Sequence, residues 1–376
     1  MRILIAPDSF KGSLNSSQVI DILSNKLKNL EFIKAIERVS LADGGEGSLE
    51  VIVENLDFRK ESLSVFNPLF KKINAWYLYD KRTKTAYVEM AKASGLMLIS
   101  KLDVMNTSSF GTGQLIKHAI ENGAKKIVLF IGGSATNDAG VGIANALGLY
   151  FKDKNGEELK PIGKNLLDIH SIDDSESILK KYPAEILIAA DVNNLFYGNN
   201  GAAYVYAPQK GASLREVIHL DKGLQNISAI FKAQYNIDVQ NIKGSGAAGG
   251  IGGGMIALFN AKLISGSELI FELTDIEQKI KSVDLIITGE GKIDEQTLND
   301  KLIFKLSKLA HNYNKMVWAV CGYYKGGDRL KKLLGIEKIF SLAKSKKEIE
   351  FTINNAEIKL SETATEIAEQ IKNFKL

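Results

Sequence analysis

Cysteine is nearly absent from the sequence, with Cys321 the only one among 376 residues. An intrachain disulfide cannot form, which excludes a secreted fold stabilised by disulfides. We also expect no export signal, because the apolar run in MRILIAP is far too short for one and is followed directly by Asp8 and Lys11. These features favour the reducing environment of the cytoplasm.

No charge of one sign dominates the sequence, which has 48 Lys and Arg against 44 Asp and Glu. The densest basic run, Lys344 with Lys346 and Lys347, lies among acidic residues, as is typical of a solvated face. We therefore expect no nucleic acid partner. The long uncharged stretch 244–261 has seven glycines in its first eleven positions. Because it lacks the apolar content of a membrane span, we expect no membrane partner and a glycine loop that leads into a helix.

The common nucleotide and nucleophile motifs are missing as well. No Gly-x-x-x-x-Gly-Lys-Ser/Thr or Gly-x-Ser-x-Gly occurs, and the four histidines lack the spacing of zinc ligands. A formal Gly-x-Gly-x-x-Gly is present at Gly244, Gly246 and Gly249. The residues before it are mostly polar and do not predict a strand, so a phosphate-binding or tightly packed glycine loop is favoured over a dinucleotide site.

Both ends of the chain repeat the order strand, loop, helix. A short apolar run without polar alternation occurs at Ile3–Ala6, and further strands are predicted at Ile36–Leu41, Asp284–Thr288 and Met316–Val320. Such runs are typical of parallel strands that are covered on both faces. In between, Glu61–Phe66, Lys72–Tyr79 and Thr85–Met90 alternate at period two, as expected of antiparallel strands, and a long amphipathic helix is predicted at Leu214–Tyr235.

The sequence therefore predicts an α/β fold with two domains. A discontinuous Rossmann-like domain of parallel strands comprises residues 1–65 and 284–376, and a large mixed α/β domain, residues 66–283, is inserted into it. We expect the active site in the cleft between the domains.

Five loops that follow predicted strands are rich in carboxylates, amides and glycine, and ligands of open α/β sheets bind beyond the carboxyl ends of strands. Any one of these loops is also explained by turn and capping residues, but five together favour a site for an anion and Mg²⁺, as phosphoryl transfer requires. The loops begin at Pro7, Ala42, Gly132, Asp191 and Gly289.

Taken together, the loops resemble the type I glycerate kinases of bacteria. The matching blocks include APDSFKGSL, LADGGEGS, IGGSATNDAGVGIANALG, AADVNNLFYGNNGAAYVYAPQKGA, GSGAAGGIGGG and DLIITGEGKIDEQT, in order along nearly the whole chain. Departures are small, such as Asn194 and Leu195 without an intervening proline. The resemblance implies ATP and Mg²⁺ as co-substrates and D-glycerate as acceptor, so the expected partners are small molecules.

Several alternatives stay open at this point. The product is 2- or 3-phosphoglycerate, and the sequence does not decide whether the chain forms a homodimer. A rival function is an NAD(P)-dependent oxidoreductase of a small hydroxy acid, which rests on the loop at Gly244. A third is a two-lobed protein that binds a small anion without catalysis.

Chemical roles can be assigned within the matching blocks. We expect Lys11 to act on the phosphoryl group, with Lys210 and Lys292 as further candidates, and Asp191 to orient or deprotonate the acceptor hydroxyl. Candidate Mg²⁺ ligands are Asp43, Glu46, Glu290 and Asp294. Candidate contacts to substrate or phosphate are Asp8, Ser9, Ser134, Thr136, Asn137, Lys210, Gly246 and Gly249.

Overall fold

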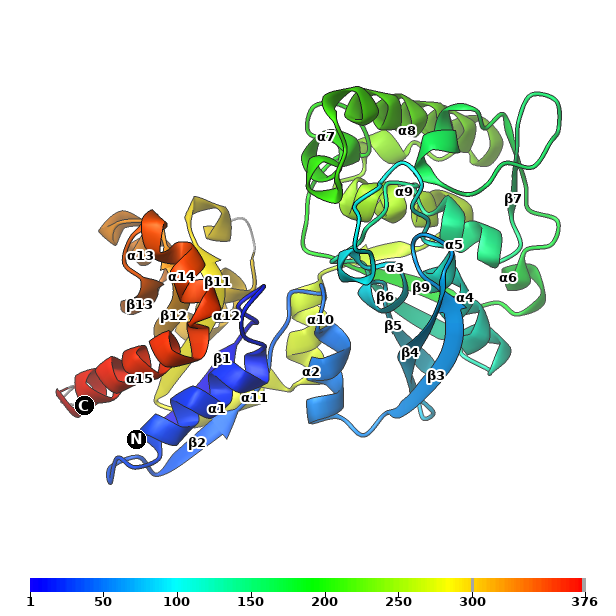
Figure 1. Ribbon diagram of the computed structural model, residues 1–376. Helices are drawn as coiled ribbons and strands as arrows, with labels where there is room; N and C mark the ends of the chain where they lie inside the picture. The colour runs from blue at the N-terminus through cyan, green and yellow to red at the C-terminus, as the bar shows by residue number, and fades with distance from the viewer. Residues whose placement is uncertain (299–300, 374–376) are drawn as a thin grey trace. The chain divides into compact units, whose positions relative to one another are not determined.

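The computed structural model describes residues 1–298 and 301–373, which fold as two compact units (Figure 1). The first unit comprises Met1–Asp43, Glu50–Leu56 and Ser267–Leu376, and the second comprises Gly44–Leu49 and Asp57–Gly266. The chain thus leaves the first unit and returns to it, as the discontinuous domain predicted from the sequence requires.

The first unit is built on a five-stranded parallel sheet with the order β13-β12-β11-β1-β2. Its strands are β1 (Arg2–Pro7), β2 (Ala35–Arg38), β11 (Leu285–Ile293), β12 (Met316–Tyr324) and β13 (Lys338–Ala343). The N-terminal strand pairs with β11 in a register that runs from Ile3 opposite Leu285 to Pro7 opposite Gly289. The prediction that both ends of the chain share one parallel sheet is therefore confirmed.

Helices cover both faces of this sheet. On one face, α1 (Ser16–Leu27) and α15 (Ala356–Asn373) pack on each other and share a core with Ile3 and Ile5 of β1. On the other face, where Leu4 is buried, α11 (Ile276–Ser282) contacts β1 and α12 (Leu302–Asn312) contacts β11 and β12. Burial on both faces explains why these strands read as uninterrupted apolar runs.

The strand order places a topological switch point between β1 and β11. From β1 the chain proceeds to β2 at one edge, whereas from β11 it proceeds to β12 and β13 at the other. Numbered within the unit, the order is 2-1-3-4-5, the doubly wound arrangement that binds ligands where the loops after its first and third strands diverge. The loop after Pro7 and the carboxyl end of β11 flank that point; Glu290, predicted to lie in a loop that begins at Gly289, lies within β11 because the strand extends to Ile293 beside β12.

The second unit contains a six-stranded mixed sheet with the order β10-β9-β6-β5-β4-β3. Antiparallel pairs join β3 (Arg59–Phe66), β4 (Lys72–Asp80) and β5 (Thr85–Glu89), as predicted. Parallel pairs join β5 to β6 (Lys126–Phe130), β6 to β9 (Glu185–Ala189) and β9 to β10 (Lys262–Ile264). The loops after β5, β6 and β9 therefore leave the sheet at the same edge.

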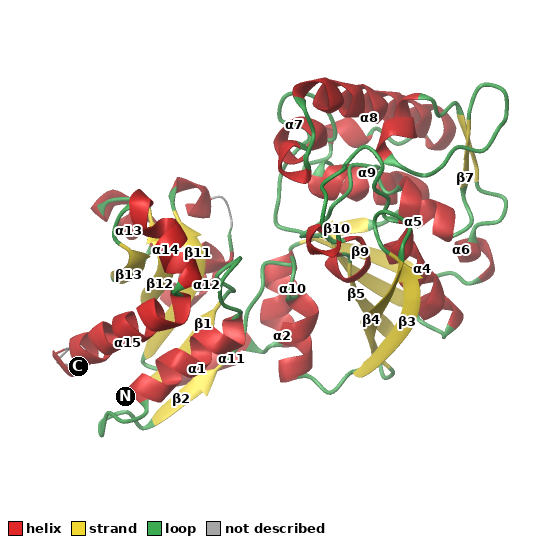
Figure 2. Ribbon diagram, in the orientation of Figure 1, coloured by secondary structure: helices red, strands yellow, loops and turns green. Residues whose placement is uncertain are grey.

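Two cores stabilise the second unit. One lies against the sheet and includes Ile251 and Met255 of α9 (Ala247–Phe259), and the other surrounds α8 (Leu214–Tyr235) and includes Ala257 of α9. Figure 2 shows α9 between α8 and the sheet. The bounds of α8 match the predicted amphipathic helix. The residues described include no helix that is long and apolar enough to cross a membrane.

The unit boundaries differ from those predicted at residues 65 and 283. Strand β3 pairs with β4 along its whole length, so residues 57–65 belong to the second unit. At the other end, α10 (Gly266–Leu273) and α11 group with the first unit. Alternating polarity identified β3 as a strand, but only its pairing partner determines the sheet to which it belongs.

Candidate active site

A cavity of about 360 Å³ lies at the carboxyl ends of β1, β11 and β12 in the first unit. It is therefore located at the switch point of the sheet, where the fold predicts a ligand. Residues predicted from the sequence that line it are Asp8, Ser9, Lys11, Asp43, Glu290 and Lys292. Residues separated by more than 240 positions in the chain are brought together here.

Three carboxylates and one lysine interact at the polar end of this cavity. The Lys11 Nζ donates a hydrogen bond to Asp43 Oδ2 over 3.1 Å, and the charge of Asp43 raises the pKa of Lys11. Burial and then the charge of Asp43 raise the pKa of Asp8 to about 8, although Lys11 opposes this shift. Burial also raises the pKa of Glu290, whose Oε1 accepts a hydrogen bond from Thr297.

This electrostatic arrangement is suited to an additional cation. Burial and neighbouring carboxylates raise the pKa of Asp8 and of Glu290, so that a cation bound beside them would favour their ionised forms. Within the described ranges, no three His, Cys, Asp or Glu side chains are placed to hold a metal by themselves. Mg²⁺ commonly takes only one or two protein carboxylates and completes its shell with phosphate oxygens and water. Asp43 and Glu290 fit that mode.

The other two predicted metal ligands, Glu46 and Asp294, do not line this cavity. Asp294 accepts hydrogen bonds from the Gln296 amide, over 2.9 Å, and pairs with Lys292 Nζ at 2.6 Å. Burial alone would raise the pKa of Asp294, but these partners lower it. Glu46 belongs to the second unit, where a Cβ on Gly133 would lie 3.6 Å from Glu46 Oε2. The structure thus brings together two of the four predicted ligands, Asp43 and Glu290.

In the second unit, the loop after β6 is organised around a buried lysine. Lys210 lies in a short 3₁₀ helix and its Nζ donates hydrogen bonds to Ser134 Oγ over 2.8 Å and to the Thr136 carbonyl over 2.6 Å. Burial lowers the pKa of Lys210 to about 7, and the charge of Asp138 opposes this shift. The lysine predicted to bind phosphate therefore has direct contacts to two other predicted residues.

Unpartnered polar atoms mark the same loop. Thr136 Oγ1 and both amide atoms of Asn137 are buried and have no hydrogen-bond partner among the residues that the structure describes. Buried polar atoms in proteins are nearly always paired with protein groups or with bound molecules. The loop after β6 is thus equipped to bind a small polar molecule.

Close packing of glycines holds this loop against α9. Gly249 has φ of +74°, and a Cβ there would lie 2.2 Å from the Thr136 carbonyl oxygen. A Cβ on Gly246 would lie 2.0 Å from the carbonyl oxygen of Leu195. Both positions therefore require glycine for backbone packing, and a direct contact of either to phosphate stays a prediction.

Asp191 follows β9, the neighbour of β6, so its loop leaves the sheet beside the loop after β6. Asp191 is half-buried, and its Oδ1 accepts a hydrogen bond from Ser265 Oγ over 2.8 Å. A carboxylate held in one orientation at this edge is suited to accept a proton from a bound hydroxyl group.

Two buried carboxylates that fix these loops were not predicted as site residues. Asp138 accepts hydrogen bonds from the Ser109 amide and hydroxyl over 2.7 and 2.8 Å. Glu89 at the end of β5 accepts from the amides of Gly47 and Leu49 over 3.2 and 3.0 Å. Glu89 could have been found in the sequence because it is a charged residue at the end of an apolar strand, directly before Met90.

The buried Lys210 predicts a pH-dependent stability. Between pH 7 and about 10.5 the unfolded chain holds a proton on Lys210 that the folded chain does not, so Lys210 makes stability rise with pH in this window. Below pH 7 the group is protonated in both states and contributes no slope. The quantity to compare is the difference in free energy of unfolding between the native protein and the Lys210→Met variant. We expect this difference to rise by up to about 1.4 kcal/mol per pH unit above pH 7.

Urea unfolding at several pH values from 6 to 10 measures this difference. The exposed Lys222 on α8 provides the matched control, since Lys222→Met should give a difference that does not change with pH. The same flat result for Lys210→Met would contradict the account of its burial.

Comparisons with known proteins agree with the predicted resemblance along the whole chain. The model of the Glycerate kinase family matches residues 3–372. Glycerate 2-kinase from Escherichia coli K12 is 37% identical over 347 residues, 92% of this chain and 91% of that protein. Glycerate kinase from Halalkalibacterium halodurans is 36% identical over 368 residues, 97% of each chain.

Solved structures give the same result. A crystal structure of a protein from Salmonella typhimurium LT2, described as a candidate glycerate kinase 2, matches with a TM-score of 0.81 and 34% sequence identity, covering 99% of this chain and 98% of that one. The match in fold, sequence and length leads to one assignment: the chain belongs to the Glycerate kinase family.

Proposed function

We propose that this protein is a type I glycerate kinase, which transfers the γ-phosphoryl group of ATP to D-glycerate with the help of Mg²⁺. The observation that carries the proposal is the position of Lys11 among Asp8, Asp43 and Glu290 at the switch point of the first unit. Phosphoryl transfer requires a cationic side chain for the transferred group and carboxylates for the metal, and this cavity supplies both.

In this proposal the first unit supplies the groups that act on the donor. Lys11 stabilises negative charge on the γ-phosphoryl group as it develops. Asp43 and Glu290 hold Mg²⁺, which when bound neutralises charge on the phosphates. The Ser9 amide, which donates to Asp8 Oδ1 over 2.6 Å, keeps the Asp8 carboxylate in place beside them. Glu46 and Asp294 remain candidates whose contacts in the structure favour a supporting role.

The second unit supplies the groups that act on the acceptor. The unpartnered atoms of Thr136 and Asn137 support hydrogen bonds to the carboxylate and hydroxyl groups of D-glycerate. Lys210 orders this loop through Ser134 and supplies positive charge when protonated. Asp191 orients or deprotonates the acceptor hydroxyl.

An oxidoreductase function has no comparable support. A dinucleotide fingerprint lies between a strand and a helix of a βαβ unit. Here the residues before Gly244 form a 3₁₀ turn, Val239–Asn241, and Gly249 and Gly250 have left-handed backbone conformations within α9. The relatives named above are kinases, not dehydrogenases.

The reaction is tested by ³¹P NMR of the products formed from ATP, D-glycerate and Mg²⁺. Because the relative from Escherichia coli is named a 2-kinase, we expect ADP and 2-phosphoglycerate in equal amounts. Addition of EDTA should stop the reaction. Undiminished turnover in EDTA would contradict the metal role, and reduction of NAD⁺ by glycerate without release of ADP would favour the oxidoreductase.

Replacement of Lys11 tests the donor side. We expect Lys11→Ala to lower kcat by a factor on the order of 10² or more, because charge that acts on the transition state is lost. The melting temperature should stay unchanged, since Lys11 lies in an exposed part of the loop. Lys26→Ala, at an exposed position of α1, is the matched control and should keep full activity. A kcat/KM of Lys11→Ala near that of the native protein would shift the role to Lys210.

Replacement of Asp191 tests the acceptor side. Asp191→Asn preserves the shape of the side chain and removes its charge, and we expect kcat to fall about 10² to 10⁴ fold with little change in melting temperature. Ser265→Ala, which removes the hydrogen bond that orients Asp191, should cause a smaller loss. If Asp191→Asn instead lowers stability and its residual activity follows the folded fraction, Asp191 is a structural cap.

A further inference from the structure

We propose that the adenosine part of the nucleotide binds in the cavity of the first unit, with the base against an apolar wall formed by Leu342, Ile349 and Ile353. The phosphates then extend along the carboxyl edge of the sheet to Lys11. This inference rests on the proposed use of ATP, and it adds a location and a set of base contacts for it.

The cavity changes in polarity along the edge of the sheet. Leu342 belongs to β13 and Tyr323 to β12, whereas Glu290 belongs to β11 and Asp8 follows β1. These strands are neighbours in that order, so the lining changes from apolar to charged across three strand spacings, roughly 14 Å. A ligand that fills the cavity therefore has an apolar end and a charged end separated by about the length of a nucleoside triphosphate.

The apolar end is formed by side chains that a flat ring would cover. Leu342 is buried, Ile349 is half-buried, and Ile353 is 43% exposed at the surface of α14 (Ile349–Asn354). Transfer of the exposed surface of Ile353, and of the part of Ile349 that water reaches, out of water favours binding. Thr352, on the same helix, also lines the cavity and offers a hydroxyl group for a ring nitrogen. D-Glycerate is too small and too polar to use this wall.

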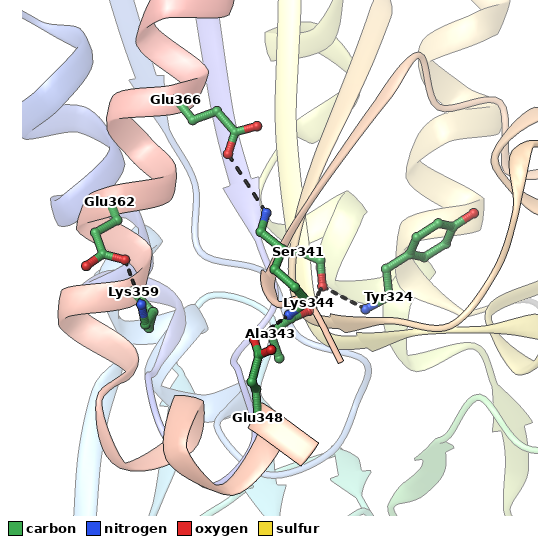
Figure 3. A network of polar contacts seen from close by, with 8 residues as sticks. All are labelled: Tyr324, Ser341, Ala343, Lys344, Glu348, Lys359, Glu362 and Glu366. Carbon is green, nitrogen blue, oxygen red and sulfur yellow. Dashed lines mark hydrogen bonds and ion pairs between the residues drawn. The ribbon is translucent and has the colours of Figure 1, made fainter. Parts of the chain in front are cut away.

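A network of hydrogen bonds holds the wall in position (Figure 3). The Ser341 hydroxyl accepts from the Tyr324 amide over 3.0 Å and donates to the Ala343 carbonyl over 2.7 Å, which joins the ends of β12 and β13. The Lys344 amide donates to Glu348 Oε2 over 3.0 Å, immediately before α14 begins. The helix is thus fixed to the strand ends, so the wall is formed before the ligand binds.

Lys344 extends the network toward α15. Its Nζ lies 4.0 Å from Glu366 Oε2 (Figure 3). The Ser345 hydroxyl donates to Glu348 Oε1 over 3.0 Å. The segment between β13 and α14 therefore contacts both α14 and α15.

The two ends of the cavity select the class of ligand. An isolated anion would need none of the apolar wall, and an apolar ligand would not need the charged end. A phosphorylated heterocycle uses both the apolar wall and the charged end.

The test is calorimetric titration of the full-length protein with ADP, which requires no turnover. We expect Ile353→Trp, which fills the apolar end from an exposed position, to weaken ADP binding roughly tenfold or more. The KM for ATP should rise similarly, while the KM for D-glycerate should not change. Ile358→Trp is the matched control, because Ile358 is 61% exposed on α15 and does not line the cavity.

Two further measurements make the outcome decisive. Ile353→Ser shortens the apolar contact without filling the cavity and should also weaken ADP binding. This variant keeps the inference testable if Ile353→Trp does not fold. Inorganic tripolyphosphate should bind more weakly than ADP. ADP affinity that Ile353→Trp and Ile353→Ser leave unchanged, or tripolyphosphate binding as tight as that of ADP, would overturn the inference.

Failure of the inference is distinguishable from failure of the proposed function. A native protein that phosphorylates D-glycerate but whose KM for ATP is insensitive to Ile353 retains the function and loses this site. A protein whose ADP affinity depends on Ile353 but which does not phosphorylate D-glycerate retains the site and loses the function.

Discussion

The parallel pairing of β1 with β11 is the constraint on which the first unit depends. It joins Ile3–Pro7 to Leu285–Gly289 across almost the full length of the chain. Because parallel strands end at the same edge of a sheet, the pairing places the loop of Lys11 beside Glu290 at the carboxyl end of β11. After β1 the chain continues to one edge of the sheet and after β11 to the other, and the cavity lies at the switch point between these two strands. Without this register, the carboxylates around Lys11 would not meet.

Buried charges order the loops of the second unit in a similar way. Lys210 fixes the loop after β6, Asp138 fixes its continuation through Ser109, and Glu89 holds the segment around Gly47. Each charge loses hydration on burial, and each recovers part of that free energy through two or three hydrogen bonds. Removal of such a partner would leave an unsatisfied buried group, so these loops have little freedom to rearrange. Preorganised loops of this kind are suited to hold a small substrate in one orientation.

Much of the fold was predictable from the sequence because local pattern determines it. Uninterrupted apolar runs identified the strands at Ile3 and Leu285, and alternating residues identified the hairpin strands. The predicted boundary at residue 65 differs from the unit boundary of the structure, which assigns β3 to the second unit, because alternation does not reveal the partner of a strand.

The candidate site was predictable in part for the same physical reasons. Carboxylates in polar segments after predicted strands indicated Asp8, Asp43 and Glu290, which line one cavity in the structure, and their chemical roles stay predictions. Pairing between side chains carries no sequence signal, so the contact between Asp294 and Lys292 was missed. The apolar wall was also missed, since Ile349 and Ile353 lie in the charged segment SKKEIEFTINN and look like a solvated helix until β13 places them over the cavity.

The central claim is that the first unit binds the nucleotide and the second binds the acceptor. Hydrogen–deuterium exchange of the full-length protein, measured separately with ADP·Mg²⁺ and with D-glycerate, tests it most directly. The account predicts that ADP slows exchange at residues 8–14, 290–294 and 349–356, and that D-glycerate slows exchange at residues 132–138 and 190–194. Slowing by ADP of the glycine segment 244–254, with no change in the first unit, would contradict it.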